Sequence, residues 1–233
     1  MTEFKGLTGN QLKIIALISM TLDHVGVELL PQFEILRIIG RIAFPIFAFM
    51  ISEGCRYTKN RKNYLLLMSS LAVIFQIVYF VATRSLYQCV LVTFSFAIGL
   101  IYIFDYTCKR KSFFSVSILI FYLCALLFVC RILPLFLIDF YFSIDYGFFG
   151  ILLPLCIYIG KTHKQKLVML TVGLIILAID LGDFQPYSLI TVCFLALYNG
   201  KRGKRSMKYL FYFYYPLHLI IIYAVGFIPQ ILR

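Results

Sequence analysis

The sequence predicts an all-α protein, a polytopic transmembrane helical bundle of about nine spans with a cytoplasmic N-terminus. Three observations lead to this fold class. Of the 233 residues, 62% are hydrophobic, and the mean hydropathy is +0.92, whereas soluble domains are only about 45–50% apolar. The basic residues form short clusters between long apolar runs. A lipid bilayer is therefore the expected partner, and the net charge of +12 does not indicate nucleic-acid binding.

Nine apolar stretches are candidate spans, because a membrane helix needs about 20 mostly apolar residues. They are 11–30, 36–55, 63–82, 87–105, 113–131, 146–160, 166–182, 186–199 and 209–229. The apolar piece 132–145 is too short and too interrupted for a span, and we interpret it as re-entrant or interfacial. No repeat or linker divides the chain, so residues 1–233 are predicted to form a single membrane domain.

The loops between these stretches predict the orientation. Basic loops lie at 56–63, 109–111, 161–166 and 201–208, and they alternate with loops that hold Glu34, Asp139, Asp145, Asp180 and Asp183. Loops rich in lysine and arginine stay in the cytoplasm. We therefore expect a multi-pass protein of the bacterial cytoplasmic (inner) membrane, with the N-terminus inside and the C-terminus outside.

The first stretch, 11–30, carries Lys13, Asp23, His24 and Glu28. An ionisable group at the centre of a membrane helix costs at least ~2.5–3.5 kcal/mol. Lys13 and His24 share one helix face, because their 11-residue spacing is about 20° from a whole number of turns. The rise between them is about 16 Å, which places Lys13 at the cytoplasmic edge and His24 near mid-membrane. Glu28 is one turn further along and is assigned to substrate binding. Asp23 is assigned to the catalytic group with His24, but it points about 100° away and is expected to meet another helix.

A cation at the membrane surface and an imidazole at mid-depth suit an elongated ligand with an anionic head and a reactive tail. Coenzyme A thioesters have this shape, with phosphates at one end and the thioester at the end of a long arm. Lys13 alone is equally compatible with ordinary snorkelling. His24 carries the functional interpretation, because ionisable residues inside a membrane mark functional sites.

Several blocks of the sequence resemble one protein family. The first is "LKIIALISMTLDHVG", with Lys13 and His24 separated by ten residues. The others are "IGRIAFPIFAFMISEGCRYTKNRKNY" (39–64) with Arg41, Pro45, Glu53 and Gly54, "DYGFFG" (145–150), "LYNGKRG" (197–203) with Asn199, and "KYLFYFYYPLHLIIIY" (208–223) with Tyr215, Pro216 and His218. Together they are similar to the TraX family of polytopic membrane acetyltransferases. The resemblance implies a place among membrane acyltransferases with a basic residue, ten residues and a histidine in the first span. One branch of the family is known for pilin acetylation in conjugation, and the acceptor does not transfer with the resemblance.

Residues of the second span have two interpretations each. Arg37 and Arg41, one turn apart, either neutralise Asp23 across a helix interface or bind an oxyanion or the acceptor. Pro45 is expected to kink the span and free a backbone carbonyl. Glu53 is close in height to Lys13, so it is expected either to pair with that lysine or to serve the donor site.

Further candidates come from the rest of the chain. His218 lies some ten residues into the last span, at the height of His24, where it binds the thioester carbonyl, relays a proton or is a core histidine. Tyr215 is assigned to the donor site, and Asp145 is either an acceptor ligand or an exposed loop acid. Basic-loop residues are expected to hold the donor phosphates or only to set topology: Asn199, Lys201, Arg202, Lys204 and Arg205.

These residues predict an acetyl-CoA-dependent N- or O-acyltransferase. The nucleotide docks at Lys13 and the bases around 201–205, and His24, kept neutral by desolvation, takes a proton from the attacking acceptor. Arg41 or His218 stabilises the oxyanion. No serine or cysteine stands on the Lys13–His24 face, so direct transfer is favoured, and an acyl-histidine stays open.

Two other classes compete with the enzyme. A proton-coupled transporter also buries acids and histidines but usually has inverted repeats, and none is evident. A non-catalytic membrane assembly protein needs no histidine pair at mid-membrane. No metal is expected, because Glu53 lies about half a membrane away from His24 and His218. The acceptor (peptide, glycan or lipid; amine or hydroxyl), the acyl chain length and the oligomeric state stay open.

Overall fold

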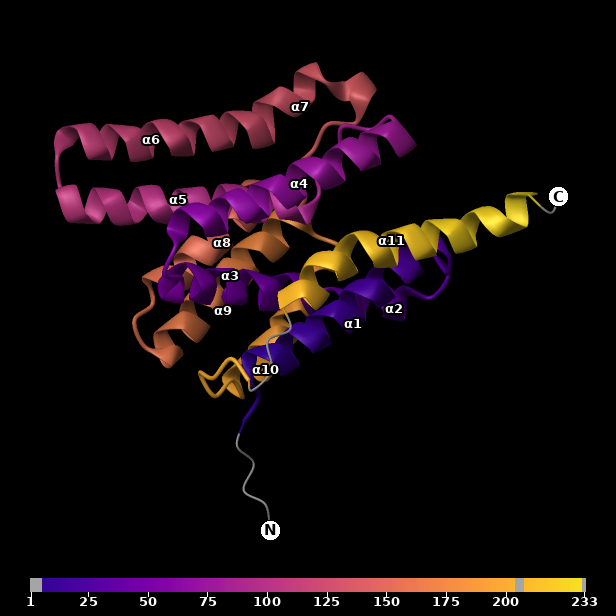
Figure 1. Cartoon of the computed structure of the whole chain (residues 1–233), viewed down its shortest axis with the longest axis horizontal. Helices are drawn as coiled ribbons and strands as arrows, with labels where there is room; N and C mark the ends of the chain where they lie inside the picture. The colour runs from indigo at the N-terminus through magenta and orange to yellow at the C-terminus, as the bar shows by residue number, and fades with distance from the viewer. Residues whose placement is uncertain (1–5, 204–207, 232–233) are drawn as a thin grey trace, which may run out of the picture. The chain divides into compact units, whose positions relative to one another are not determined.

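The chain folds into helices throughout the part described by the computed structural model, residues 6–203 and 208–231 (Figure 1). The elements are α1 Gly9–Glu28, α2 Glu34–Gly40, α3 Ala43–Tyr57, α4 Arg61–Thr83, α5 Val90–Arg110, α6 Phe113–Leu127, the π-helix η1 Phe128–Ile132, α7 Leu133–Phe136, the 3₁₀ helix η2 Ile138–Phe140, α8 Gly147–Ile159, α9 His163–Leu181, the 3₁₀ helix η3 Gln185–Ile190, α10 Thr191–Ala196 and α11 Lys208–Ile231. Only isolated bridges, and no strand, occur in these ranges. The predicted all-α class is confirmed.

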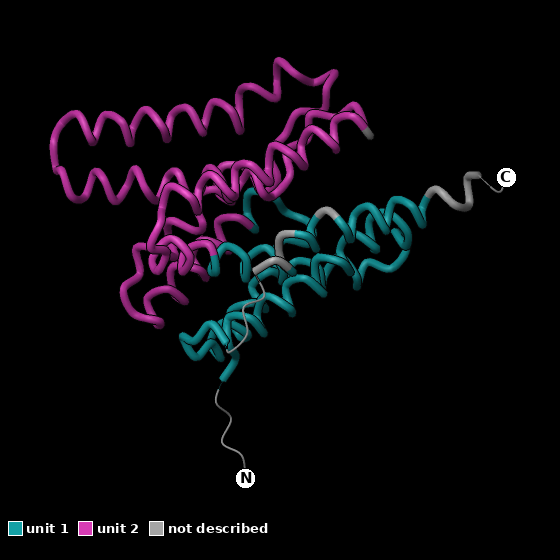
Figure 2. The backbone as a smooth tube through the Cα atoms, in the orientation of Figure 1, with its two compact units in different colours: residues 1–50, 178–233 teal, residues 51–177 magenta. Residues whose placement is uncertain are grey.

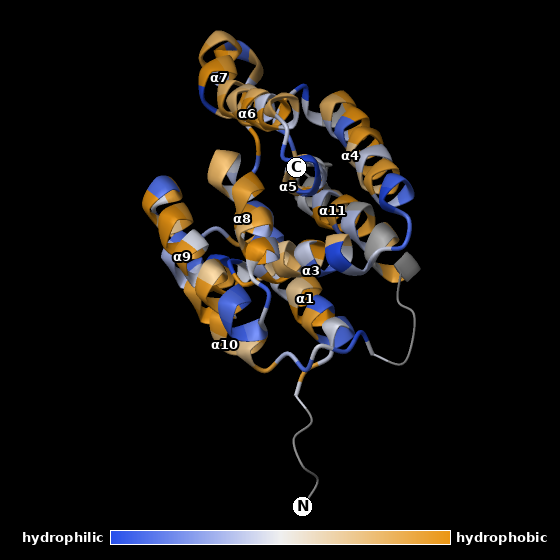
Figure 3. Cartoon of the chain, turned by 90° about the vertical axis from the view of Figure 1, so that its left-hand side faces the viewer, coloured by the Kyte–Doolittle hydropathy of each residue, from blue (hydrophilic) through white to orange (hydrophobic). Residues whose placement is uncertain are grey.

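Four helical segments are long and apolar enough to cross a membrane: Glu34–Tyr57, Arg61–Val81, Val90–Arg110 and Phe113–Phe136. Shorter apolar helices cover Gly147–Ile159, Gln185–Ala196 and Phe213–Gly226. Hydrophobic residues cover most of α4, α6 and α8 (Figure 3), and α4 exposes large apolar side chains such as Ile74 and Ile77. These surfaces are those of a membrane protein, because water would not stabilise them. The count of nine spans stays a prediction.

The second predicted span, 36–55, is interrupted. Helix α2 ends at Gly40 and α3 begins at Ala43. Pro45 lies in the first turn of α3, where proline is tolerated, and it has no N–H for the carbonyl four residues earlier. The expected kink is thus present at the start of α3, and the neighbouring carbonyl of Ile42 accepts a hydrogen bond from Thr191 Oγ1 at 3.4 Å.

The fifth predicted span, 113–131, continues further than expected. Helix α6 passes through the π-helix η1 into α7, so the helical segment ends at Phe136. The piece 132–145 is therefore partly the end of this helix and partly the short η2. Its large side chains Leu135, Phe136 and Ile138 are exposed, which fits the predicted interfacial location.

The chain divides into two compact units (Figure 2). In unit 1, residues 1–50 and 178–233, α1 packs against both α2 and α11, and η3 packs against α2. In unit 2, residues 51–177, α5 packs against α4, α6 and α8. The expectation of one membrane domain stays a prediction, and each unit is described by itself below.

Candidate functional site

The N-terminal end of α1 is bound to the basic loop that precedes α11. Thr8 caps the helix and shares a capping box with Gln11. The carbonyls of Lys201 and Arg202 accept hydrogen bonds from the amides of Gly9 and Asn10, at 2.8 and 3.0 Å. The loop is therefore held at the first turn of α1 by its backbone.

This attachment gathers positive charge at one end of the helix. The side chains of Lys201 and Arg202 are exposed, and the charges of Lys13 and Arg202 are close enough to repel each other. The predicted grouping of Lys13 with this loop is thus present. Lys204 and Arg205, which were also predicted to serve the donor, lie outside the described residues.

Asn199 organises the loop. Its amide donates to the Leu7 carbonyl at 2.9 Å, and its Oδ1 accepts from the Lys201 amide at 3.0 Å. Asn199 thus ties the loop to the segment before α1. These contacts position Lys201 for its predicted donor role, and they give Asn199 itself a structural task.

Asp23 is held by two arginines of the second span. Arg41 NH2 donates to both carboxylate oxygens at 2.6 Å, and Arg37 NH1 lies 3.1 Å from Oδ1. The close approach of the helices requires glycine at position 40, because a Cβ there would lie 2.3 Å from the Cβ of Asp23. The prediction that Asp23 meets another helix instead of orienting His24 is confirmed, as is its pairing with an arginine.

The two membrane histidines face each other. The ring centroids of His24 and His218 are 5.2 Å apart, and the rings are tilted by 55°. His218 is buried, whereas His24 is half-buried. The predicted convergence of the two histidines is confirmed by this contact, whereas their depth in a membrane stays a prediction.

Aromatic residues of α11 fix the His218 ring. Tyr214 stacks on it at 5.4 Å between centroids, and Tyr215 contacts it edge-on at 5.6 Å. Nδ1 of His218 lies 2.9 Å from the Tyr214 carbonyl oxygen. Because a carbonyl only accepts, Nδ1 carries the proton, and a neutral His218 presents a lone pair at Nε2. That buried Nε2 has no hydrogen-bond partner among the described residues. Tyr215, predicted for the donor site, thus lies at the histidine pair.

Two further contacts dock α11 on α1. Thr21 Oγ1 donates to the Leu17 carbonyl, and it lies 2.7 Å from the Tyr214 hydroxyl. The Tyr223 hydroxyl donates to Glu28 Oε1 at 3.3 Å. Glu28, predicted to bind substrate, is exposed and is engaged with α11 by this hydrogen bond.

The predicted pairing of Glu53 with Lys13 is wrong. Glu53 belongs to unit 2, where its Oε1 lies 2.5 Å from Lys166 Nζ, and both side chains are 9% exposed. A buried carboxylate needs a cation in direct contact, and Lys166 of α9 supplies it. The role of Glu53 in donor binding stays a prediction.

Asp145 also belongs to unit 2. Its backbone amide donates to the Gln88 carbonyl at 2.9 Å, and its own carbonyl accepts from Thr93 Oγ1 at 2.6 Å. These bonds fix the turn before α8. The proposed acceptor role of the side chain stays a prediction.

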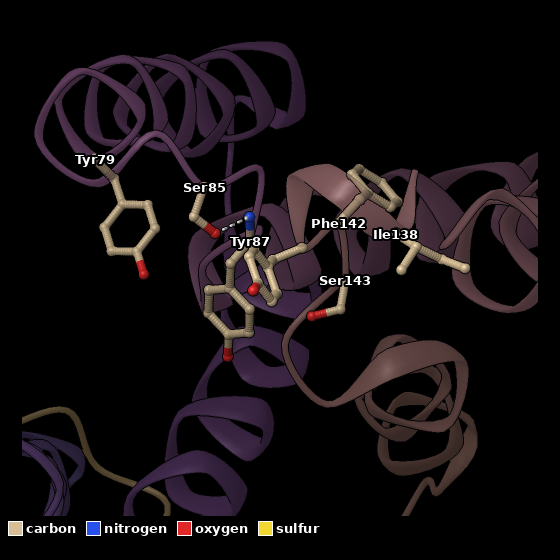
Figure 4. A pocket seen from close by; sticks show the side chains of 7 residues that line it. Tyr79, Ser85, Tyr87, Ile138, Phe142 and Ser143 are labelled. Carbon is tan, nitrogen blue, oxygen red and sulfur yellow. Dashed lines mark hydrogen bonds between the residues drawn. The ribbon is translucent and has the colours of Figure 1, made fainter. Parts of the chain in front are cut away.

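A pocket of about 580 Å³ opens beside the same loops of unit 2 (Figure 4). It is lined by Tyr79, Ser85, Tyr87, Ile138, Tyr141, Phe142 and Ser143. Ser85 Oγ accepts from the Tyr87 amide at 3.2 Å, so part of the polar lining is already used within the protein. None of these residues was selected from the sequence.

Asp105 is the main charged residue that the sequence analysis missed. It lies 2.5 Å from Arg61 and accepts a hydrogen bond from the Tyr158 hydroxyl at 2.8 Å. Nearby, Arg56 donates to the carbonyls of Tyr158 and Gly160. An acid four residues before the basic run at 109–111 was the available signal, because the other charged residues around that loop are bases.

The fold and the site define a class: a helical membrane protein that holds a histidine pair beside a carboxylate with two arginines. The chain belongs to the TraX family, since the family model described as "TraX protein" matches residues 8–226. Those residues contain Lys13, the Asp23 cluster, the histidine pair and the basic loop, all within one family unit.

Two relatives are similar to the chain over different lengths. The "Probable fimbrial assembly protein FimC, serogroup H1" of Dichelobacter nodosus is 27% identical over 241 residues, covering 91% of this chain and 93% of that protein. An uncharacterized protein of Rickettsia prowazekii (strain Madrid E) is 34% identical over 106 residues, covering 44% of this chain and 39% of that protein. No solved structure matches the chain.

Proposed function

We propose that this TraX protein is an acetyl-CoA-dependent membrane acyltransferase. It would move an acetyl group from cytoplasmic acetyl-CoA to an amine or hydroxyl of a peptide, pilin-like or envelope acceptor. The observation that carries the proposal is the His24–His218 pair, with 5.2 Å between ring centroids. Ionisable residues within membrane segments are costly, and such residues typically mark functional sites.

In the proposed reaction, the acceptor nitrogen or oxygen attacks the thioester carbonyl carbon while His24 takes its proton. The carbon–sulfur bond then breaks, and coenzyme A leaves as a thiolate that takes up the proton. His218 is suited to proton relay, because its Nδ1–H donates to the Tyr214 carbonyl and its Nε2 lone pair can accept a proton. This tautomer favours relay over the alternative oxyanion role of His218.

Stabilisation of the oxyanion is then assigned to the arginines. Arg37 and Arg41 share the single carboxylate of Asp23, so the cluster keeps an excess positive charge next to His24. Positive charge fixed before the reaction stabilises a developing oxyanion most effectively in a site that excludes water. The side chains of Arg41 and Asp23 are only 13% and 15% exposed.

The donor would bind along α1. Its phosphates dock against Lys13, Lys201 and Arg202, and its arm extends toward His24. The distance fits, because His24 lies 11 positions after Lys13 on one continuous helix, a rise of about 16 Å.

This direction requires the basic loop to be cytoplasmic, as in the proposed nine-span topology of an inner-membrane protein. A cysteine introduced at Lys201, in a background whose exposed native cysteines are replaced, should react with impermeant reagents only after the membrane is opened. Labelling in intact cells would reverse the proposed orientation.

The function is tested with isotopically labelled acetyl-CoA supplied to membranes with and without the protein. Mass spectrometry should find label in an acceptor only when the protein is present. His24→Ala should lower this transfer by ~10²–10⁴-fold, the usual contribution of a general base, and excess donor should not restore it. Full transfer by His24→Ala would contradict the mechanism.

A non-catalytic assembly role is the second candidate, favoured by the name of the Dichelobacter nodosus relative, a probable fimbrial assembly protein. It makes a different prediction for the same variant. A scaffold needs its surface but not its imidazole, so His24→Ala would keep fimbrial assembly and wild-type protein would transfer no label.

A further inference from the structure

The helix η3 presents a buried polar face. Gln185, Ser188 and Thr191 are spaced by three residues, and a 3₁₀ helix has three residues per turn, so the first two align and Thr191 follows at its end. All three are buried, with exposed fractions of 3%, 0% and 0%. Neutral polar side chains are thus gathered in the interior of unit 1.

Two members of this face differ from the third. Thr191 Oγ1 donates to the Ile42 carbonyl at 3.4 Å. Within the described residues, Gln185 Nε2, Gln185 Oε1 and Ser188 Oγ have no hydrogen-bond partner. Buried polar atoms almost always have a hydrogen-bond partner, so several buried polar atoms without one in a single helical turn require an explanation. A hydrophobic side chain at Gln185 would pack without this loss.

The face is connected to the proposed reactive site. Helix η3 packs against α2, which carries Arg37. Thr191 bonds the carbonyl of Ile42, the residue that follows Arg41. Arg41 in turn holds Asp23, the neighbour of His24. All of these residues belong to unit 1.

The chemistry of the orphan atoms specifies a ligand group. A carboxamide offers an N–H donor and a carbonyl acceptor in one plane, and a hydroxyl adds either function. The complementary neutral group is a secondary amide, which offers the same two functions. We propose that Gln185 and Ser188 bind an amide group of a substrate.

This proposal rests on the proposed function, because that function names the substrates that could carry the amide. The pantetheine arm of acetyl-CoA contains two amides, and a peptide acceptor has one at each bond. The shared chemistry is the amide, and simple probes separate the sources. Pantetheine lacks both the nucleotide and the acyl group, and trialanine represents a peptide with a free amine.

The test compares Gln185→Leu with Thr191→Val by thermal unfolding and by calorimetric titration of both probes in detergent. Gln185→Leu should keep or raise the unfolding midpoint and weaken binding of one probe at least tenfold. Thr191→Val, which loses a satisfied hydrogen bond, should lower the midpoint and leave probe binding unchanged. Ser188→Ala should weaken the same probe as Gln185→Leu.

Three results would overturn the assignment: a lowered midpoint or failure to fold in Gln185→Leu, unchanged probe binding in that variant, or no binding of either probe to wild type. The proposed function is judged separately by label transfer in wild type. If wild type transfers label and Gln185→Leu binds both probes normally, only the amide-site proposal fails. If wild type binds a probe but transfers no label, only the proposed acyltransferase function fails.

Discussion

Both units bury carboxylates against cations, but the two units differ in how many cations each carboxylate contacts. In unit 2, Glu53 pairs with one lysine, and Asp105 pairs with one arginine and one tyrosine. In unit 1, Asp23 holds two arginines and directly precedes His24. A balanced pair completes its own interactions and serves stability. In the proposed reaction, the unbalanced cluster next to His24 keeps positive charge available for the oxyanion. Buried charge alone therefore does not identify a site.

The largest expected effect is the loss of a balanced pair. Glu53→Gln leaves Lys166 buried without its carboxylate, which should cost about 3–5 kcal/mol of unfolding free energy. Glu53→Leu combined with Lys166→Met should recover most of this loss, because it removes both charges. Denaturant unfolding in detergent measures both effects, with the exposed Glu28→Gln as control. A double variant as unstable as the single one would show that the pair does more than neutralise charge.

Asp23→Asn should destabilise the fold less than Glu53→Gln does, but it should lower turnover more. Without the carboxylate, Arg37 and Arg41 repel each other, and α2 no longer holds the turn of α1 that carries His24. Misplacement of a reacting group by about 1 Å costs roughly 10²-fold in rate. Acetyl transfer per folded molecule is the measurement.

Asp105→Asn is the matched control for this experiment, because it removes a carboxylate from a balanced cluster. Its turnover per folded molecule should equal that of wild type. Equal losses in Asp23→Asn and Asp105→Asn would abolish the distinction between the two clusters.

The smallest effect is expected at the basic end of α1. Lys13→Ala removes one charge-assisted contact, worth roughly 1.5–3 kcal/mol, so acetyl-CoA should bind about ten- to a hundred-fold more weakly. The rate at saturating donor should stay the same. Calorimetric titration is the measurement, and Lys164→Ala, an exposed lysine of unit 2, is the control. A larger loss of donor affinity in His24→Ala than in Lys13→Ala would reverse the direction of the donor.

Relations within one helix could be predicted from the sequence. The shared face of Lys13 and His24 follows from 100° per residue, and the outward direction of Asp23 follows from the same number. The height of His218 followed from counting residues in from the loop. The structure places its ring 5.2 Å from that of His24, between centroids, as two residues at equal positions along neighbouring helices can be.

Relations between helices at equal height could not be predicted in the same way. The sequence analysis considered only Lys13 as a partner for Glu53. Lys13 and Lys166 both lie at basic ends of apolar stretches, and position along the chain does not distinguish between them. The choice depends on which helices pack, and the structure selects Lys166. The same limit explains the missed pairing of Asp105 with Arg61. The orphan atoms of Gln185 and Ser188 likewise become evident only when the neighbours of η3 are known.

The contact between α1 and α11 has a consequence for how the protein is made. It joins Thr21 to Tyr214, which are 193 positions apart in the sequence. A ribosome adding ~5–20 residues per second needs roughly 10–40 s to travel that distance. During this interval α1 and α2 can already form the Asp23 cluster, because they are consecutive helices. His24 meets His218 only when the last helix emerges, so the nascent chain can neutralise Asp23 before it can form the histidine pair.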